Sequence, residues 1–283
     1  MGIRSLAVCI VILIIINTGF KWPQSEFRIT STFGESRTDH FHDGVDIISS
    51  SRSFYPVADG IVLYVWNRAF YPFENYTGSG NYAIIDHGEH ASAYLHLEDS
   101  PILKQRVSSN EPLCLYQNTG RSYGSHLHFG IYNRASWNSY NFLKLVDPLE
   151  DNIAPVIDHI GFSIDGSIIR VSDNSQIRLT AHHPVLFNMF DSIQNGDRHG
   201  IYKLIVYLNG KEIRNITFDE LVYGKNGLTI SGMMFQDIFE GKDYYKVNGI
   251  IYNNGVNKFK VVATDLAGNS TEKEFTLTIR LDF

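Results

Sequence analysis

Residues 40–50 read HFHDGVDIISS, and this stretch joins two polar side chains to the pattern of a buried strand. The run VDII at 45–48 is apolar and rich in β-branched residues, which is typical of strands. His42 and Asp46 stand on either side of Gly44. Because an imidazole and a carboxylate at this spacing also arise by chance, their meaning depends on which other histidines the fold brings alongside.

More short β-like runs follow this stretch, roughly every 8 to 20 residues, which predicts an antiparallel sheet. They are GIVLYVW at 60–66, NYAIID at 81–86, ASAYLHL at 91–97 and SHLHFGIY at 125–132. The longest interruption is NRAFYPFENYTGSG at 67–80, which is aromatic and ends in glycines. It predicts a surface loop and a candidate wall of a binding groove, with an ordinary flexible loop as the alternative.

A second group of strands follows the segment DPLEDNIAP at 147–155, whose prolines and acidic residues predict a linker. YKLIVYLNGKEIRNITF at 202–218 is typical of a hairpin that turns at Asn209-Gly210. KFKVVATDLAGNSTEKEFTLTIRL at 258–281 repeats this arrangement. We therefore predict an all-β protein, in which an antiparallel β-sheet domain at 21–150 precedes a small β-sandwich at 151–283.

The N-terminus has the pattern of an export signal. Arg4 precedes an unbroken apolar run from Leu6 to Ile16, which is shorter than the roughly 18 to 20 apolar residues that a spanning helix needs. We interpret residues 1–20 as a signal peptide. Since no small-x-small cleavage site follows, an uncleaved anchor is the alternative, and it is the only membrane contact that we expect.

Charge and cysteine content exclude other classes of partner and bond. Thirty acidic against twenty-four basic residues give a net charge of −6, and no dense Lys/Arg tract is present, so nucleic acid is not an expected partner. Once the signal is removed, Cys114 is the only cysteine, which excludes an intrachain disulfide. Its apolar neighbours predict a small buried hydrophobe rather than a nucleophile.

Three further histidines lie in the predicted strands of the first domain. His126 and His128 form an HxH pair, and the period of two in a strand places both imidazoles on one face. His96 stands between two leucines in AYLHLE and is expected to point to the opposite face from them. The order of the motifs argues against a cupin barrel, in which HxH would come first.

With His42 and Asp46 these histidines make a set of five. Two histidines and one carboxylate suit Zn²⁺ in tetrahedral geometry with the fourth position left to water. Two spare histidines beside such a site imply catalysis, because a structural zinc has four protein ligands.

The motifs of the first domain resemble, in order and spacing, those of the LytM/lysostaphin-type zinc metallopeptidases that cut peptidoglycan. The resemblance covers about residues 27–132. It rests on HxGxD at 42–46, PVADGIVLYV at 56–65, NYAIIDHG at 81–88, YLHL at 94–97 and GSHLHF at 124–129. It implies a zinc endopeptidase acting on peptidoglycan stems or cross-links. The short N-terminal signal and the lack of cell-wall repeats favour D-alanyl cross-links in the periplasm or cell envelope, with a glycine-rich bridge as the alternative.

The resemblance also implies a role for each of the five residues. His42, Asp46 and His128 would bind zinc, while His96 and His126 would flank the water and handle its proton, in an order that the sequence leaves open. The glycine-rich G-x-x-V-x-x-G-Q segment and a later glutamate of the family are replaced here by RVSSNEPLCLYQNTG and HFGIY. These departures concern substrate register and leave the five residues intact.

Other histidines are not expected to bind metal. His40 lacks the x-Gly-x-Asp continuation that follows His42, and the family pattern places His87 and His90 away from the site. Four histidines of the second half lack metal-type spacing and are interpreted as surface or loop residues. They are His159, His182, His183 and His199.

The second half carries no catalytic cluster. Its TDLAGN turn at 264–269 is similar to a turn of bacterial immunoglobulin-like modules, and a hydrogen-bonded turn is favoured there over a calcium site at Asp265 and Asn269. We expect residues 154–283 to position the enzyme or contact an envelope protein, without a part in the chemistry. An inactive envelope-binding or amidase-activating module is the alternative function for the whole chain.

Overall fold

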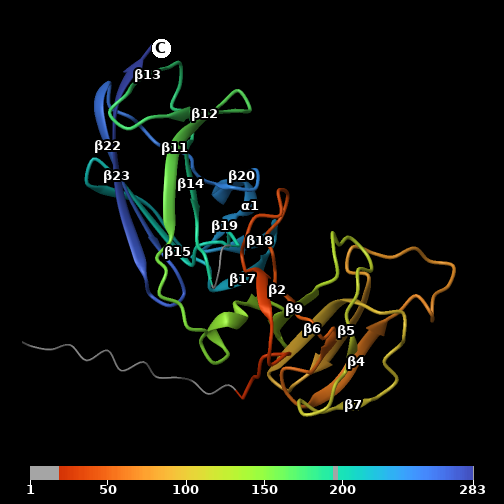
Figure 1. The fold of residues 1–283 in the computed structure, drawn as a ribbon. Helices are drawn as coiled ribbons and strands as arrows, with labels where there is room; N and C mark the ends of the chain where they lie inside the picture. The colour runs from red at the N-terminus through yellow and green to blue at the C-terminus, as the bar shows by residue number, and fades with distance from the viewer. Residues whose placement is uncertain (1–18, 194–196, 283) are drawn as a thin grey trace, which may run out of the picture.

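The computed structural model describes residues 19–193 and 197–282 and shows two β-rich lobes (Figure 1). The predicted all-β class is confirmed, since one α-helical turn and one 3₁₀ turn are the only helices of the described ranges. Residues 1–18 of the signal peptide predicted at 1–20 lie outside these ranges. No helix in the described part of the chain is long and apolar enough to cross a bilayer.

The first lobe is built on a large sheet in the order β19-β18-β17-β10-β9-β6-β5-β4-β7, with β2 pairing to β9 and β1 to β2. The strands β3 and β8 form a separate antiparallel pair. The predicted runs at 45–48, 60–66 and 81–86 coincide with β2, β4 and β5. The elements are β1 Arg28–Ser31, β2 Val45–Ile48, β3 Ser53–Phe54, β4 Gly60–Trp66, β5 Asn81–Asp86, β6 His90–Leu97, β7 Arg106–Val107, β8 Cys114–Leu115, β9 Leu127–Asn133, β10 Ser139–Tyr140 and the 3₁₀ turn Phe142–Lys144.

The second lobe is a sandwich of two five-stranded sheets, β12-β11-β14-β21-β20 and β13-β23-β22-β15-β16. Among the described strands, only β13 and β23 pair in parallel. The strands of the sandwich are β11 Val156–Ile164, β12 Ser167–Val171, β13 Gln176–Leu179, β14 Val185–Phe190, β15 Lys203–Leu208, β16 Lys211–Thr217, β20 Phe239–Glu240, β21 Tyr244–Val247, β22 Gly255–Thr264 and β23 Ser270–Leu281. Between β16 and β20 the chain forms β17 Glu220–Gly224, β18 Gly227–Ile230 and β19 Met233–Met234, which extend the sheet of the first lobe, and the helical turn α1 Phe235–Ile238.

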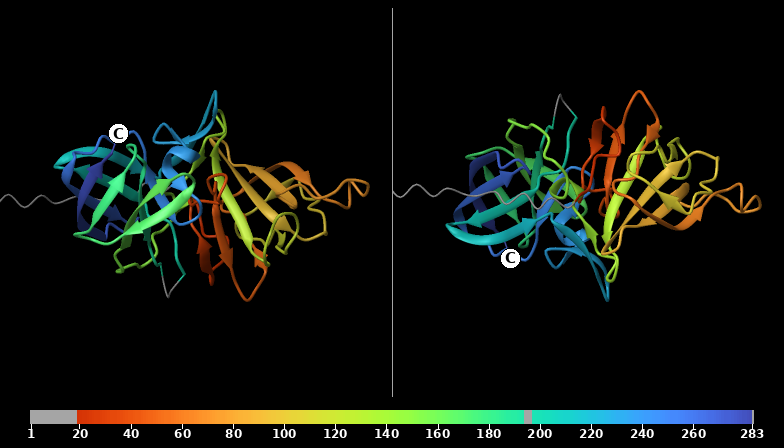
Figure 2. Two further views of the ribbon diagram at one scale, coloured as in Figure 1. Left: turned by 90° about the horizontal axis from the view of Figure 1, so that it is seen from above. Right: turned by 90° about the horizontal axis from the view of Figure 1, so that it is seen from below.

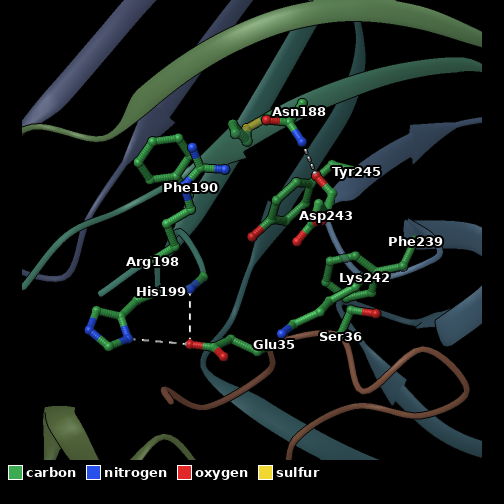
Figure 3. Close-up of a pocket in the computed structure, with 12 residues that line it drawn as sticks. Glu35, Ser36, Asn188, Phe190, Arg198, His199, Phe239, Lys242, Asp243 and Tyr245 are labelled. Carbon is green, nitrogen blue, oxygen red and sulfur yellow. Dashed lines mark hydrogen bonds and ion pairs between the residues drawn. The ribbon is translucent and has the colours of Figure 1, made fainter. Parts of the chain in front are cut away.

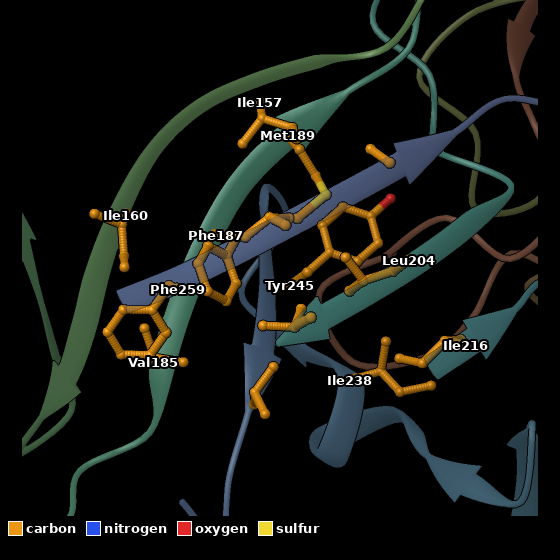
Figure 4. Packing of buried hydrophobic residues seen from close by; sticks show 14 of the residues in the cluster. Ile157, Ile160, Val185, Phe187, Met189, Leu204, Ile216, Ile238, Tyr245 and Phe259 are labelled. Carbon is orange, nitrogen blue, oxygen red and sulfur yellow. The ribbon is translucent and has the colours of Figure 1, made fainter. Parts of the chain in front are cut away.

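The hairpin predicted at Asn209-Gly210 is confirmed. Both residues have positive φ, 51° and 83°, as the tight turn between β15 and β16 requires. Aromatic and aliphatic side chains from both sheets fill the space between them, including Phe187 of β14 and Phe259 of β22 (Figure 4). Alternation along the strands thus produces one apolar layer inside the sandwich.

Segments of the two lobes are interleaved. In both views of Figure 2 the red N-terminal segment lies between the lobes. Phe33 and Phe41 of this segment belong to the hydrophobic cluster of the sandwich, and β17 of the second half pairs with β10 in the first sheet. The division of the chain at residues 147–155 remains a prediction, and a broad contact crosses it.

Glu35 makes the polar part of this contact. Its carboxylate accepts a hydrogen bond from the backbone N–H of Gly200 at 3.0 Å and lies 3.7 Å from Nδ1 of His199 (Figure 3). Burial alone would raise the pKa of Glu35, but His199, His42 and the hydrogen bonds of Ser31 and Thr32 lower it to about 2. Glu35 is therefore ionised at neutral pH and holds the second half against the segment that precedes His42.

Candidate metal centre

The structure brings His42, Asp46 and His128 together in the first lobe. Nε2 of His42 lies 3.1 Å from Oδ1 of Asp46 and 3.0 Å from Nδ1 of His128. Nδ1 of His128 lies 3.0 Å from the same carboxylate oxygen. The three atoms form a nearly equilateral triangle, and all three side chains are buried. A single ion could therefore bind all three atoms, two nitrogens and one oxygen.

Strand pairing creates this arrangement. Asp46 on β2 is the direct cross-strand partner of His128 on β9. Facing residues of an antiparallel pair have side chains on the same side of the sheet, so the carboxylate and the imidazole meet. The backbone N–H of His42 donates to the carbonyl of Glu35, and its carbonyl accepts from Gly34, which fixes the turn ahead of β2.

Gly44 lets this turn pass close to β9. A Cβ atom at position 44 would lie 2.8 Å from Nε2 of His128 and would also collide with the carbonyl oxygen of Phe129. We expect Gly44→Ala to destabilise the fold by about 1–3 kcal/mol, because the backbone must shift to relieve the overlap. Thermal unfolding and zinc content would measure this. Gly78→Ala is the matched control, since nothing lies within 4 Å of its added Cβ; equal stability of the two variants would contradict the packing argument.

Acceptor groups surround both buried imidazoles, and in His42 a hydrogen bond sets the tautomer. Nδ1 of His42 lies 2.7 Å from the carbonyl oxygen of Thr32, which can only accept, so this nitrogen carries the proton and Nε2 presents its lone pair. In His128 both ring nitrogens face carboxylates, Nε2 at 3.4 Å from Asp43 and Nδ1 at 3.0 Å from Asp46, so an ion that replaced the proton on Nδ1 would leave Nε2 facing Asp43. Metal-binding histidines commonly have such an acceptor behind the ring.

The electrostatics of the triangle suit a cation. Burial would raise the pKa of Asp46, but the neighbouring His42 and His128 outweigh it and hold the pKa well below its usual range. Burial would lower the pKa of His128, yet Asp43 and Asp46 outweigh it and raise the pKa to about 9. Arg37 forms an ion pair with Oδ2 of Asp46 and leaves Oδ1 for the triangle. This donor set, two imidazole nitrogens and one carboxylate oxygen, fits Zn²⁺.

His96 and His126 lie beside the triangle. Their ring centroids are 4.7 Å apart, and Nε2 of His126 lies 3.6 Å from Oδ1 of Asp46. Nδ1 of His96 donates to the carbonyl of Thr119 at 2.8 Å, and Nδ1 of His126 donates to the carbonyl of Gly124 at 2.9 Å. Each ring therefore keeps Nε2 as an acceptor.

Burial keeps these two rings neutral. It lowers the pKa of His96 to about 4, with only partial compensation from the Thr119 carbonyl. Burial also lowers the pKa of His126, against the effect of the Asp46 charge. Neutral imidazoles with a free Nε2 can accept a proton at neutral pH.

The backbone at these two positions departs from the expected strands. His96 has φ of +61°, and the register of β5 and β6 shifts between Asn81 and Ala83, so a bulge turns the His96 ring toward His126. Strand β9 begins at Leu127, one residue after His126. We expected the alternation of side chains along two strands to set the positions of these rings. The bulge and the start of β9 show that alternation alone does not do so.

Sequence patterns missed the residues that surround the triangle. Arg37 on Asp46 and Thr32 behind His42 come from the turn between β1 and β2, which has no recognisable motif. Asp43 stands next to His42 in the quoted stretch, and Tyr132 donates to its carboxylate at 3.0 Å. Of these residues, only Asp43 could have been found from the sequence, because it is a hydrogen-bond acceptor directly next to the predicted ligand His42.

The remaining histidines lie elsewhere. His40 is exposed and pairs with Asp39, and His87 is hydrogen-bonded to Asp59 and Ser92. The interpretation of His199 as a surface or loop residue was wrong: its backbone forms a β-bridge with Asp191 and its side chain is fully buried. The lobe interface covers it, which local sequence does not reveal.

Two features near the site agree with their sequence patterns. Cys114 is partly buried in β8, and burial raises the pKa of its thiol, which keeps it protonated. The loop at 67–80 exposes Phe70 and Phe73 to solvent, and the carbonyl of Ser79 at its end accepts from the backbone N–H of His96. The loop is therefore attached to the edge of the site.

Residues 40–141 match the model of peptidase family M23, and a second family model without a functional description matches residues 154–280. The peptidoglycan DD-endopeptidase ShyA of Vibrio cholerae is 30% identical over 143 residues, which are 47% of this chain and 31% of ShyA. An uncharacterized metalloprotease of Haemophilus influenzae is 33% identical over 122 residues, which are 40% of this chain and 24% of that protein. The chain thus spans less than a third of the length of these curated relatives.

Solved structures with similarity to the chain include LytU and the catalytic domain of lysostaphin from Staphylococcus simulans. LytU is 25% identical, with 42% of this chain and 83% of that chain covered and a TM-score of 0.34. The lysostaphin domain is 18% identical, with 41% and 90% covered and a TM-score of 0.31. By its sequence match and its motifs, the segment 40–141 is a LytM-type metallopeptidase domain of peptidase family M23.

Proposed function

We propose that this chain is a zinc-dependent endopeptidase that hydrolyses peptide bonds of peptidoglycan. The observation that carries the proposal is the triangle of His42, Asp46 and His128 with two neutral histidines beside it. These three residues would hold the ion. When bound, Zn²⁺ would polarise the scissile carbonyl and make water acidic enough to supply hydroxide near neutral pH.

His96 and His126 would carry the proton. Each ring is held from behind by a backbone carbonyl, so its Nε2 is aimed and unprotonated before substrate arrives. One of them would accept the proton of the attacking water on Nε2 and, as an imidazolium, could then donate to the oxyanion that develops on the carbonyl, while the other would accept a hydrogen bond from the same water and orient it. The proton then passes to the leaving amine. Arg37 and Thr32 would keep Asp46 and His42 in place during this sequence.

The substrate class rests on the relatives and on the family match. ShyA is named as a peptidoglycan DD-endopeptidase, and we extend this activity to the present chain, with D-alanyl cross-links favoured over glycine-rich bridges. The wall lies outside the cytoplasm, so we propose an exported protein of the periplasm or cell envelope. The exposed loop 67–80 would form one side of the substrate groove.

Digestion of purified sacculi tests this function. We expect the zinc-loaded chain to convert cross-linked muropeptide dimers to monomers, as measured by chromatography and mass analysis. His126→Ala should lower this conversion by roughly 10²–10⁴-fold, because it removes a group that moves a proton in the reaction.

His40→Ala is the matched control, since it removes an exposed histidine from the same turn as His42. Its digestion should equal that of the unchanged chain. An unchanged muropeptide profile at saturating zinc, with sacculi of both cross-link types, would refute hydrolysis and favour the inactive envelope-binding alternative.

A further inference from the structure

Three aspartates converge where the linker meets the sandwich. Asp191 directly follows β14 and Asp265 directly follows β22, so they come from opposite sheets, and Asp151 lies in the segment ahead of β11. One carboxylate oxygen of each lies within 4.8 Å of the other two. This cluster is separate from the metal centre and plays no part in the chemistry proposed there.

Asp191 is the unusual member of the cluster. Its residue is 3% exposed, and its Oδ1 is buried without a hydrogen-bond partner. Asp265 is 1% exposed. In the described part of the chain, no lysine, arginine or histidine forms an ion pair with any of the three aspartates. A buried carboxylate oxygen without a hydrogen-bond partner is unfavourable and points to a ligand.

The other two carboxylates are held in place by hydrogen bonds. Oδ1 of Asp265 accepts from the backbone N–H groups of Gly268 and Asn269, and its Oδ2 accepts from the Asn269 amide at 2.8 Å. The same amide nitrogen donates to the backbone carbonyl of Asp151 at 3.1 Å, and Oδ1 of Asp151 accepts from the backbone N–H of Ile153 at 3.0 Å. Since a carboxylate has about four acceptor positions, Asp265 and Asp151 keep lone pairs for an ion while their positions stay fixed.

We propose that Asp151, Asp191 and Asp265 bind a calcium ion at the junction between the peptidase lobe and the sandwich. Three carboxylates form a hard, all-oxygen donor set, which suits Ca²⁺ better than Zn²⁺. Ca²⁺ binds oxygens at about 2.3–2.6 Å, so it can span pairs up to about 5 Å apart, whereas Mg²⁺ needs about 2.0–2.1 Å and stricter geometry. One carboxylate oxygen of each aspartate lies within 4.8 Å of the other two, so a single Ca²⁺ could contact all three.

A protonated Asp191 is the competing explanation. Burial, and then the charges of Asp265 and Asp151, raise the pKa of Asp191 to about 7, so a proton could replace the ion near neutrality. The two explanations differ in what added Ca²⁺ does. Only an ion site makes the protein respond to Ca²⁺ through Asp191.

The ion would stiffen the lobe junction. Asp191 exchanges two backbone hydrogen bonds of 2.9 Å with His199, and the next residue, Gly200, donates to Glu35 of the first lobe. Calcium on Asp191 therefore holds the strand end that contacts the segment preceding the metal centre.

The test uses the full chain loaded with zinc, in buffer freed of other divalent cations. Calorimetric titration with Ca²⁺ should show one site, and thermal unfolding should shift upward with Ca²⁺ and much less with the same concentration of Mg²⁺. Asp191→Asn should weaken Ca²⁺ binding at least tenfold and keep the zinc content of the unchanged chain, since it preserves the shape of the side chain.

Asp158→Asn is the matched control, because Asp158 is an exposed acid of the same lobe outside the cluster. It should bind Ca²⁺ as the unchanged chain does. Absence of Ca²⁺ binding at millimolar concentration by the zinc-loaded unchanged chain would overturn the proposal and favour the protonated acid. Equal Ca²⁺ binding by Asp191→Asn and the unchanged chain would also overturn it.

Discussion

Replacement of His42 by alanine is expected to remove zinc and abolish peptide hydrolysis, whereas replacement of His96 is expected to leave zinc bound and to slow hydrolysis. His42 supplies one of three donor atoms that lie 3.0–3.1 Å from one another. Two protein ligands do not hold Zn²⁺ well. His96 is outside the triangle, and its loss removes only a proton acceptor, which should lower kcat/KM by roughly 10²–10⁴-fold.

Elemental analysis and kinetics on the same samples separate the two effects. Asp46→Ala should behave as His42→Ala does, because Asp46 faces His128 across β2 and β9. The circular dichroism of all variants should match that of the unchanged chain, since the hydrophobic cluster of the sandwich does not include these side chains. Stoichiometric zinc in both His42→Ala and Asp46→Ala would show that the ligands were wrongly chosen.

The strands were predictable because their causes are local. Runs such as 60–66 and 81–86 consist of β-branched and aromatic residues bounded by turn residues, and they coincide with β4 and β5. The pairing of Asp46 with His128 could be predicted only from the resemblance of the motifs to a known family. The residues of either strand do not indicate which other strand it pairs with. The hydrogen-bonded turn at Asp265 was also predictable, since its side chain satisfies backbone groups three and four residues ahead.

What the sequence did not reveal depends on contacts between distant segments. The left-handed backbone of His96 is held by Ser79 and Gln117, which no alternation pattern includes. The burial of His199 depends on Glu35, more than a hundred residues earlier in the chain. The apolar character of Phe33 and Phe41 indicates burial, but it does not indicate that the cluster they join belongs to the second half.

These contacts lead to the second large expected effect: a chain lacking residues 154–283 should fail to form a stable zinc site. Sequence patterns alone favoured a separable C-terminal part. In the structure, its removal would expose Phe33 and Phe41 and leave β10 without its partner β17. Each phenylalanine burial contributes about 1.5–3 kcal/mol, which is a large share of a typical domain stability of about 5–15 kcal/mol.

Truncation should also weaken zinc binding, because Glu35 connects the second half to His42. Its carboxylate accepts from the backbone N–H of Thr32 at 2.6 Å, and the carbonyl of Thr32 accepts from Nδ1 of His42. Truncation removes Gly200 and His199 from the other side of Glu35. Unfolding curves and zinc affinity of the truncated and full chains would measure the combined effect.

Glu35→Ala in the full chain distinguishes an effect of the second half on zinc affinity from its effect on the stability of the fold. It keeps the apolar contact and the β10–β17 pairing but removes the group that holds Thr32, so we expect zinc affinity to fall about 10–100-fold with most of the cooperative unfolding retained. Glu240→Ala is the control, because Glu240 is an acid of the second half that pairs with Lys246 away from the metal centre. If the truncated chain unfolds cooperatively, holds stoichiometric zinc and cleaves with the kcat/KM of the full chain, the second half is separable and Glu35 has no role in positioning His42.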